Sequence, residues 1–142
     1  MNLLFLCTGN SCRSQIAEGW AHTLVGNYPD LELHIQSAGI KSHGKNPRAI
    51  AVMQEVGIDI ANQESTRLTE EILEQTDYIV TVCGHADEHC PVLPTYTRKE
   101  HWPLEDPAKA TDSEENIIQV FRACRDDIHQ RVEDLLLRLK GM

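Results

Sequence analysis

Residues 2–15 read NLLFLCTGNSCRSQ, and this stretch decides the fold that we predict for a chain of 142 residues. Residues 2–6 form an apolar run that is typical of a fully buried strand. A helix should follow from residue 13 to about residue 25, because Ile16, Trp20 and Leu24 recur at intervals of four. A buried strand that passes through one short loop into a helix is typical of an α/β protein.

The remainder of the chain continues this alternation. Asn46 and Pro47 mark the start of a second helix as its cap and first-turn proline, and Gly57 marks its end. We expect further strands at residues 31–36, 78–83 and 99–102, and further helices at 69–75 and 115–139. Strands that alternate with helices are joined by right-handed crossovers. The sequence therefore predicts an α/β fold with a doubly wound, four-stranded parallel sheet and helices on both faces.

Composition limits the classes of protein that this chain can represent. Its 22 acidic and 13 basic residues give a net charge of -9, which disfavours nucleic acid and membrane surfaces as partners. The run at residues 2–6 is too short for a signal peptide or a membrane span, so we expect a cytoplasmic protein. Neither a repeat nor a linker-like tract interrupts residues 1–142, which we treat as one domain. In a reducing compartment the five cysteines should be reactive, metal-binding or buried, not a disulfide framework.

The loop of residues 7–12 has the features of an anion site. The free N–H groups at a helix start favour an oxyanion, and Gly9 permits the unusual backbone angles of a loop that encloses one. Arg13 can contact two oxygens of a tetrahedral anion with its planar guanidinium. The same field should lower the pKa of Cys7 toward roughly 3.5–7.5, which would make it a nucleophile. Candidate binding residues are Thr8, Gly9, Asn10, Ser11, Cys12, Arg13 and Ser14.

Less specific interpretations remain open for these cysteines. Cys7 could be a buried structural cysteine at a strand end. Cys12 fits the wall of the loop, with a redox role as the alternative. Cys124 lies in the apolar stripe of the last helix and is most simply a small core residue.

Residues 83–90 read CGHADEHC and allow two interpretations. Cys83, His85, His89 and Cys90 could bind zinc, although all four ligands would come from one short segment instead of two separated pairs. In the alternative, Cys83 reaches a partner thiol and Cys90 resolves the resulting disulfide. Asp106, followed by proline, is either a turn carboxylate or the acid that protonates a departing oxygen.

Together these motifs resemble the thioredoxin-coupled arsenate reductases, which share the fold and anion loop of the low-molecular-weight protein tyrosine phosphatases. The paired cysteines at 83 and 90 favour reductase over phosphatase within this resemblance. The matching motifs are Cys-Thr-Gly-Asn-Ser-Cys-Arg-Ser-Gln at 7–15, Ser-Ala-Gly-Ile at 37–40, His-Gly-Lys-Asn-Pro at 43–47, Val-Thr-Val-Cys at 80–83, Cys-Pro at 90–91, Glu-His-Trp at 100–102 and Asp-Pro at 106–107.

The resemblance implies a complete reaction sequence. Arsenate binds to Arg13 and the loop amides, Cys7 attacks arsenic, and Asp106 protonates the leaving oxygen. Cys83 then attacks Cys7 and releases arsenite, and Cys90 attacks Cys83 to give a disulfide that thioredoxin reduces. The implied protein is a monomer that needs no cofactor.

Two further expectations follow from the resemblance. Ser14 would donate a hydrogen bond to the Cys7 thiolate. Some members bind potassium through an Asn, a Glu, a Ser and an Asp, of which the first three match Asn10, Glu18 and Ser37. The fourth falls on Thr66, so we expect no metal here.

Two other functions stay open at this point. The first is a phosphatase for phosphotyrosine or a small phosphate ester. Ala108 and Lys109 disfavour it, because a tyrosine phosphatase of this fold would have aromatic side chains there to contact the substrate ring. The second is a thiol sensor or metal-binding protein that uses residues 83–90, which would leave the anion loop unexplained.

Overall fold

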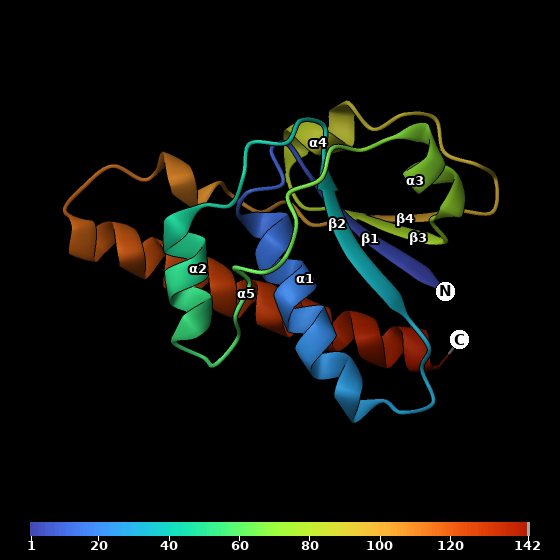
Figure 1. The fold of residues 1–142 in the computed structure, drawn as a ribbon, viewed down its shortest axis with the longest axis horizontal. Helices are drawn as coiled ribbons and strands as arrows, with labels where there is room; N and C mark the ends of the chain where they lie inside the picture. Colours follow the sequence, from blue (N-terminus) through green and yellow to red (C-terminus); the bar gives the residue numbers. More distant parts are fainter. Residues whose placement is uncertain (142) are drawn as a thin grey trace.

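A computed structural model describes residues 1–141 and contains one sheet of four parallel strands in the order β2-β1-β3-β4. The sheet has helices on both faces, which confirms the predicted α/β architecture (Figure 1). The strands are β1 (Asn2–Cys7), β2 (His34–Gly39), β3 (Tyr78–Thr81) and β4 (Arg98–His101). The helices are α1 (Arg13–Leu24), α2 (Pro47–Gln54), α3 (Glu70–Gln75), α4 (Gly84–Glu88) and α5 (Glu114–Lys140), with short 3-10 turns at Val25–Asn27 and Pro107–Lys109.

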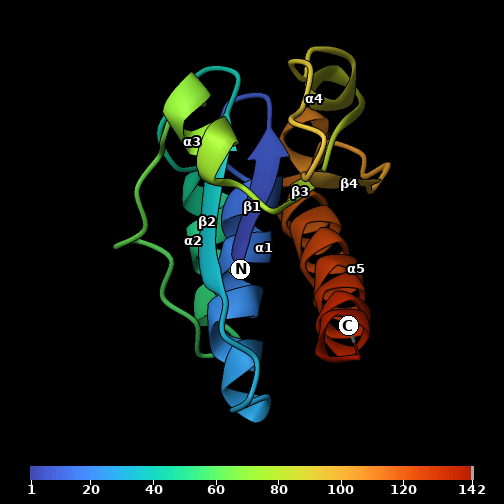
Figure 2. The ribbon, with the colours of Figure 1, turned by 90° about the vertical axis from the view of Figure 1, so that its right-hand side faces the viewer.

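The sheet separates two unequal layers of helices. Helices α1, α2 and α5 pack on one another and cover one face, while α3 lies on the other (Figures 1 and 2). The central strand β1 pairs with β2 and β3, and Leu3, Leu4, Phe5 and Leu6 are fully buried. A strand covered on both faces is apolar throughout, which explains the run that the sequence shows.

Two strands, β2 and β3, differ in their bounds from the prediction by more than one residue, whereas β1 and β4 differ by one residue. β2 begins at His34, three residues later than expected, and runs on to Gly39, because its register starts opposite Asn2 at the beginning of β1. Residues 31–33 have no strand beside them and stay outside the sheet. β3 ends at Thr81 and not at Cys83, which instead caps α4 and accepts a hydrogen bond from the Ala86 amide at 3.3 Å.

Helix α5 closes the fold behind the sheet. Its N-terminus is capped by Ser113, whose hydroxyl accepts from the Asn116 amide at 3.3 Å. Near its other end Arg138 donates to both carboxylate oxygens of Glu100 on β4 at 2.7 and 2.9 Å. Tyr78 and Trp102 donate to the same carboxylate. This network fixes the last turns of α5 to the edge of the sheet.

Candidate functional site

The loop between β1 and α1 is shaped by Asn10. This residue is fully buried and has a φ of +48°, the left-handed conformation that Asn tolerates better than most residues. Its Oδ1 accepts from the Thr66 amide at 2.7 Å and from Gln15 Nε2 at 3.1 Å, and its Nδ2 donates to Ser14 Oγ at 2.9 Å. The side chain of Asn10 thus fixes the turn from within.

The expectation for Gly9 needs correction. The residue with positive φ is Asn10, and Gly9 does not adopt that conformation. At Gly9 a Cβ would lie 2.6 Å from His43 Nδ1, so any larger residue there would displace the His43 side chain. Gly39, at the end of β2, is packed more tightly, because its Cβ would lie 2.2 Å from the Lys41 carbonyl oxygen and 2.7 Å from the Asn10 amide nitrogen.

Arg13 begins α1 and is almost completely buried. Its Nη1 donates to the Leu104 carbonyl at 2.9 Å, and its Nη2 lies 3.7 Å from Asp106 Oδ2. Its Nε is buried and has no hydrogen-bond partner in the part of the chain that the structure describes. Since buried donors are nearly always paired in folded proteins, this free N–H of a cation indicates a site for an anion.

Two buried thiols meet beside this arginine. Cys7 ends β1 and Cys83 precedes α4, and the pairing of β1 with β3 brings the two thiols together. The neighbouring Cys83 thiol and burial raise the pKa of Cys7, so the predicted low pKa of Cys7 is wrong for the form without a bound anion. Hydrogen bonds from Cys7, from Thr8 and from the Ala86 amide lower the pKa of Cys83 to about 4. These opposite shifts make Cys83 the more acidic thiol of the two.

Asp106 faces the same space. Its Oδ1 accepts from the Ala108 amide at 3.0 Å, which orients the carboxylate, and its Oδ2 is the atom nearest Arg13. The side chain is 26% exposed, so it can exchange protons with solvent. The cavity has a volume of about 620 Å³, and its lining includes Thr8, Arg13, Cys83, His85, Asp106 and Lys109.

The remaining cysteines lie in different settings. Cys90 is half-buried, follows α4 in the chain, and is not among the residues that line this cavity. Burial raises the pKa of Cys12, which agrees with a place in the loop wall. Burial also raises the pKa of Cys124 to about 12. The expected bond from Ser14 to Cys7 is not found among residues 1–141, where Ser14 Oγ accepts from Asn10 instead.

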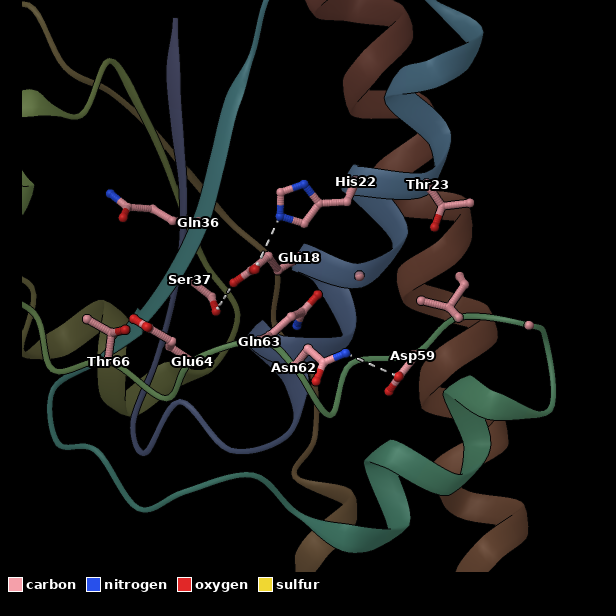
Figure 3. Close-up of a pocket in the computed structure, with 13 residues that line it drawn as sticks. Glu18, His22, Thr23, Gln36, Ser37, Asp59, Asn62, Gln63, Glu64 and Thr66 are labelled. Atoms are coloured by element: carbon pink, nitrogen blue, oxygen red, sulfur yellow. Dashed lines mark hydrogen bonds and ion pairs between the residues drawn. The ribbon is translucent and has the colours of Figure 1, made fainter.

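A second cavity, of about 580 Å³, lies between α1, β2 and the segment of residues 57–66 (Figure 3). Glu18, Ser37 and Thr66 line it, and Glu18 accepts hydrogen bonds from Ser37 at 2.6 Å and from His22 at 3.2 Å. These residues do not fit the potassium ligands of the family. Asn10 Oδ1 is already bonded to Thr66 and Gln15, and Thr66 offers no carboxylate.

The zinc interpretation of residues 83–90 finds no support in the geometry. The described residues 1–141 include no group of three or more His, Cys, Asp or Glu side chains placed to hold a metal ion. His85 instead lies beside Thr8, with Nδ1 3.1 Å from Oγ1, and its ring stacks on His89 at 4.1 Å. Sequence reasoning missed this contact, and its only signal was a histidine two residues after a cysteine at a strand end.

Taken together, these groups define a cysteine-based oxyanion site at the carboxyl edge of a doubly wound parallel sheet. The chain matches the family described as "Low molecular weight phosphotyrosine protein phosphatase" over residues 2–142. It belongs to this family.

Several similar proteins within this family are arsenate reductases. An arsenate reductase of Oceanobacillus iheyensis is 48% identical over 131 residues, which cover 92% of this chain and 91% of the relative. A solved structure described as an arsenate reductase in the phosphate binding state has a TM-score of 0.77 and 34% identity, and the match covers 97% of this chain and 98% of that one. A thioredoxin-dependent arsenate reductase of Corynebacterium glutamicum has a TM-score of 0.71 and 25% identity, with 98% of this chain and 61% of that chain covered.

Within residues 1–141, no helix combines the length and the apolar character that crossing a bilayer requires.

Proposed function

We propose that this protein reduces arsenate to arsenite through a thiol adduct and a relay of disulfides. The observation that carries the proposal is the placement of two buried free thiols, Cys7 and Cys83, after the paired strands β1 and β3 beside the unpaired Nε of Arg13. Hydrolysis of a phosphate ester needs one nucleophilic thiol, whereas reduction needs a second thiol that can reach the first. The arsenate reductases among the relatives support the same choice.

In the first step Cys7 attacks arsenic. The free Nε of Arg13 and the loop amides bind the oxyanion and hold arsenic next to the sulfur. The Cys7 proton passes to an arsenate oxygen as the S–As bond forms, which leaves the negative charge of Cys83 in place. The displaced oxygen leaves as water, and Asp106 takes up a proton from solvent beforehand and donates it to this oxygen.

In the second step the Cys83 thiolate attacks the Cys7 sulfur. The S–S bond forms as the S–As bond breaks, and the electron pair of that bond stays with arsenic. Arsenic is thereby reduced from As(V) to As(III), and the two cysteines are oxidised to a disulfide. A Cys83 pKa of about 4 keeps this attacking group ionised at neutral pH.

In the third step Cys90 attacks Cys83. Helix α4 separates the two residues: its 5 residues span about 7.5 Å at about 1.5 Å per residue, and Cys83 and Cys90 lie beyond its two ends. A disulfide needs Cα atoms about 4.4–6.8 Å apart, so α4 has to unwind as the second disulfide forms. The unwound segment would carry the disulfide to thioredoxin, the reductant named for the Corynebacterium glutamicum relative.

A phosphatase is the second candidate function, favoured by the family and by the loop itself. The residues that line the oxyanion cavity include no Phe, Tyr or Trp to receive a substrate ring, and Lys109 stands at its edge. We therefore assign phosphate-ester hydrolysis as a residual activity of the same Cys7, Arg13 and Asp106.

The test couples the purified protein to thioredoxin, thioredoxin reductase and NADPH. Arsenate should cause repeated NADPH oxidation with arsenite as product, and a glutaredoxin system should support it poorly. Hydrolysis of a chromogenic phosphate ester without any arsenate-dependent turnover would favour the phosphatase.

We further propose that the protein is cytoplasmic and monomeric. The thiol chemistry needs a reducing compartment, and the five free cysteines agree with one. Sedimentation at micromolar concentration should give the mass of one chain, about 16.0 kDa.

A further inference from the structure

His85 lines the oxyanion cavity, and the steps above give it no task. It stands two residues after Cys83 in the first turn of α4. Its Nδ1 lies 3.1 Å from Thr8 Oγ1, and the same hydroxyl oxygen lies 3.2 Å from Cys83 Sγ. The Thr8 hydroxyl therefore joins this imidazole to the second thiol.

The number of protons decides how the three groups bond. A hydroxyl has a single proton, so Thr8 can donate to only one of its two neighbours. The second step requires Cys83 as a thiolate, and an ionised sulfur is a stronger acceptor than an imidazole nitrogen. If Thr8 donates to Cys83, its oxygen can only accept from His85. Nδ1 of His85 must then carry a proton.

The contacts of the His85 ring hold it in place beside Thr8. The ring stacks on His89 at 4.1 Å with 25° between the planes, which limits its rotation. His89 itself is held by a bond from its Nδ1 to the His85 carbonyl at 2.9 Å. The charged groups that share the cavity with His85 are two cations, two carboxylates and the Cys83 thiolate, with Arg13, Lys109, Glu105 and Asp106 as the other four.

We propose that His85 is a positioning residue for the second step: its Nδ1–H holds the Thr8 hydroxyl in the orientation that donates to Cys83. The inference rests on the proposed function, since it concerns the attack of Cys83 on Cys7. His85 acts through Thr8, which stabilises the thiolate and fixes the direction of the sulfur.

The tautomer of His85 is the most direct readout. Long-range ¹H–¹⁵N correlation spectra of the full, reduced, anion-free protein should show His85 protonated on Nδ1 at neutral pH. In Thr8→Val the hydroxyl is gone, and the ring should return to the commoner form with its proton on Nε2. Protonation on Nε2 in the unchanged protein, or the same tautomer in both proteins, would overturn the inference. This measurement needs no arsenate, so it stands apart from the test of the reductase.

Rapid-quench kinetics tests the consequence for the reaction. His85→Ala should slow formation of the Cys7–Cys83 disulfide by about 5- to 10-fold, because the hydrogen bond from His85 to the Thr8 hydroxyl is lost. The rate of phosphate-ester hydrolysis should not change to the same extent. His85→Asn should restore most of the rate, because its amide nitrogen is as many bonds from Cβ as Nδ1 is. His85→Gln, whose amide lies one bond further, should not restore it.

Glu88→Ala is the matched control, since Glu88 is an exposed residue of the same helix. It should leave both reactions unchanged. An equal loss of the rate of disulfide formation in Glu88→Ala, or no recovery of that rate in His85→Asn, would contradict the proposal and leave His85 only a role in the stability of α4. If the unchanged protein reduces no arsenate, the reductase proposal fails, and the tautomer alone decides the role of His85.

Discussion

Arg13 is held so that one of its donors stays free. The Leu104 carbonyl and Asp106 engage the two terminal nitrogens, and Nε remains available inside the cavity. Only a guanidinium can satisfy these three directions at once, because its donors form a rigid planar fork.

Arg13→Lys should therefore lower kcat/KM for arsenate and for a phosphate ester by roughly 10- to 100-fold, the loss of a charge-assisted hydrogen bond of about 1.5–3 kcal/mol. Steady-state kinetics on both substrates checks this. Unchanged values for both would remove Arg13 from the site.

Gly39 tests the packing that supports the loop. Gly39→Ala places a methyl group against the Lys41 carbonyl and the Asn10 amide, and overpacking of this kind costs about 1–3 kcal/mol. We expect a lower Tm together with weaker oxyanion binding. Gly26→Ala is the control, because a Cβ there meets nothing within 4 Å, and its Tm should stay near that of the unchanged protein. Equal effects of the two substitutions would contradict the role given to Gly39.

The site residues show where sequence reasoning reached its limit. Cys7, Arg13, Cys83 and Asp106 were found from their places after strands and beside a proline, and the structure brings these four side chains around one cavity or its buried edge. The pKa of Cys7 was misjudged because the loop alone favours a thiolate, whereas the neighbouring Cys83 is the more acidic thiol. That neighbour comes from another strand, so no local pattern reveals it.

At the scale of elements, the long helices could be predicted from the sequence, whereas α4 could not. Apolar residues that recur every three or four positions predict α1 and α5. A helix of five residues is too short to show such a spacing. Its start depends on Cys83 as cap, and the sequence suggested only a polar segment. The bounds of β2 shifted for a related reason, because pairing with β1 and not composition fixes where it begins.

Helix α4 should lose its protection from hydrogen exchange once Cys83 and Cys90 are joined. The bonds from the Asp87 amide to the Cys83 carbonyl and from the His89 amide to the His85 carbonyl would break. Exchange mass spectrometry of oxidised and reduced protein checks this, with β1 as the internal reference that should not change. Equal protection of α4 in both forms would contradict its unwinding.

The contact between α5 and β4 gives a prediction on stability. Although burial alone would raise it, hydrogen bonds from Arg138, Tyr78 and Trp102 lower the pKa of Glu100 to about 2, from an ordinary value of 4.5. Glu100→Gln should reduce the free energy of unfolding at pH 7 by about 1–2 kcal/mol, a value kept low because the Arg138 side chain is half exposed.

The pH dependence of this effect has a fixed sign. A lowered pKa in the folded state stabilises the fold above about pH 4.5, and the contribution disappears as the pH falls toward 2. Urea unfolding should therefore separate the two proteins fully at pH 6 and progressively less below pH 4.5. A gap that widens on acidification would contradict the network.

At the scale of the whole molecule, an acidic protein has to bind an anion. A net charge of -9 repels an oxyanion at long range, so attraction must come from groups a few ångströms away. The parallel sheet provides for this by bringing the carboxyl ends of β1 and β3 together, which places Cys7 and Cys83 side by side. Alternation of strands and helices predicted this arrangement, and it is the part of the fold that the function most needs.

The central claim is that Cys83 attacks Cys7, and Cys90→Ser tests it most directly. Without its resolving thiol the protein should reduce about one equivalent of arsenate and then stop, because no group carries the oxidation onward. Mass spectrometry after arsenate treatment should find Cys7 linked to Cys83, and Cys83→Ser under the same treatment should show no linkage and release no arsenite. Full multiple-turnover reduction by both variants, with no Cys7–Cys83 linkage in Cys90→Ser, would contradict the relay.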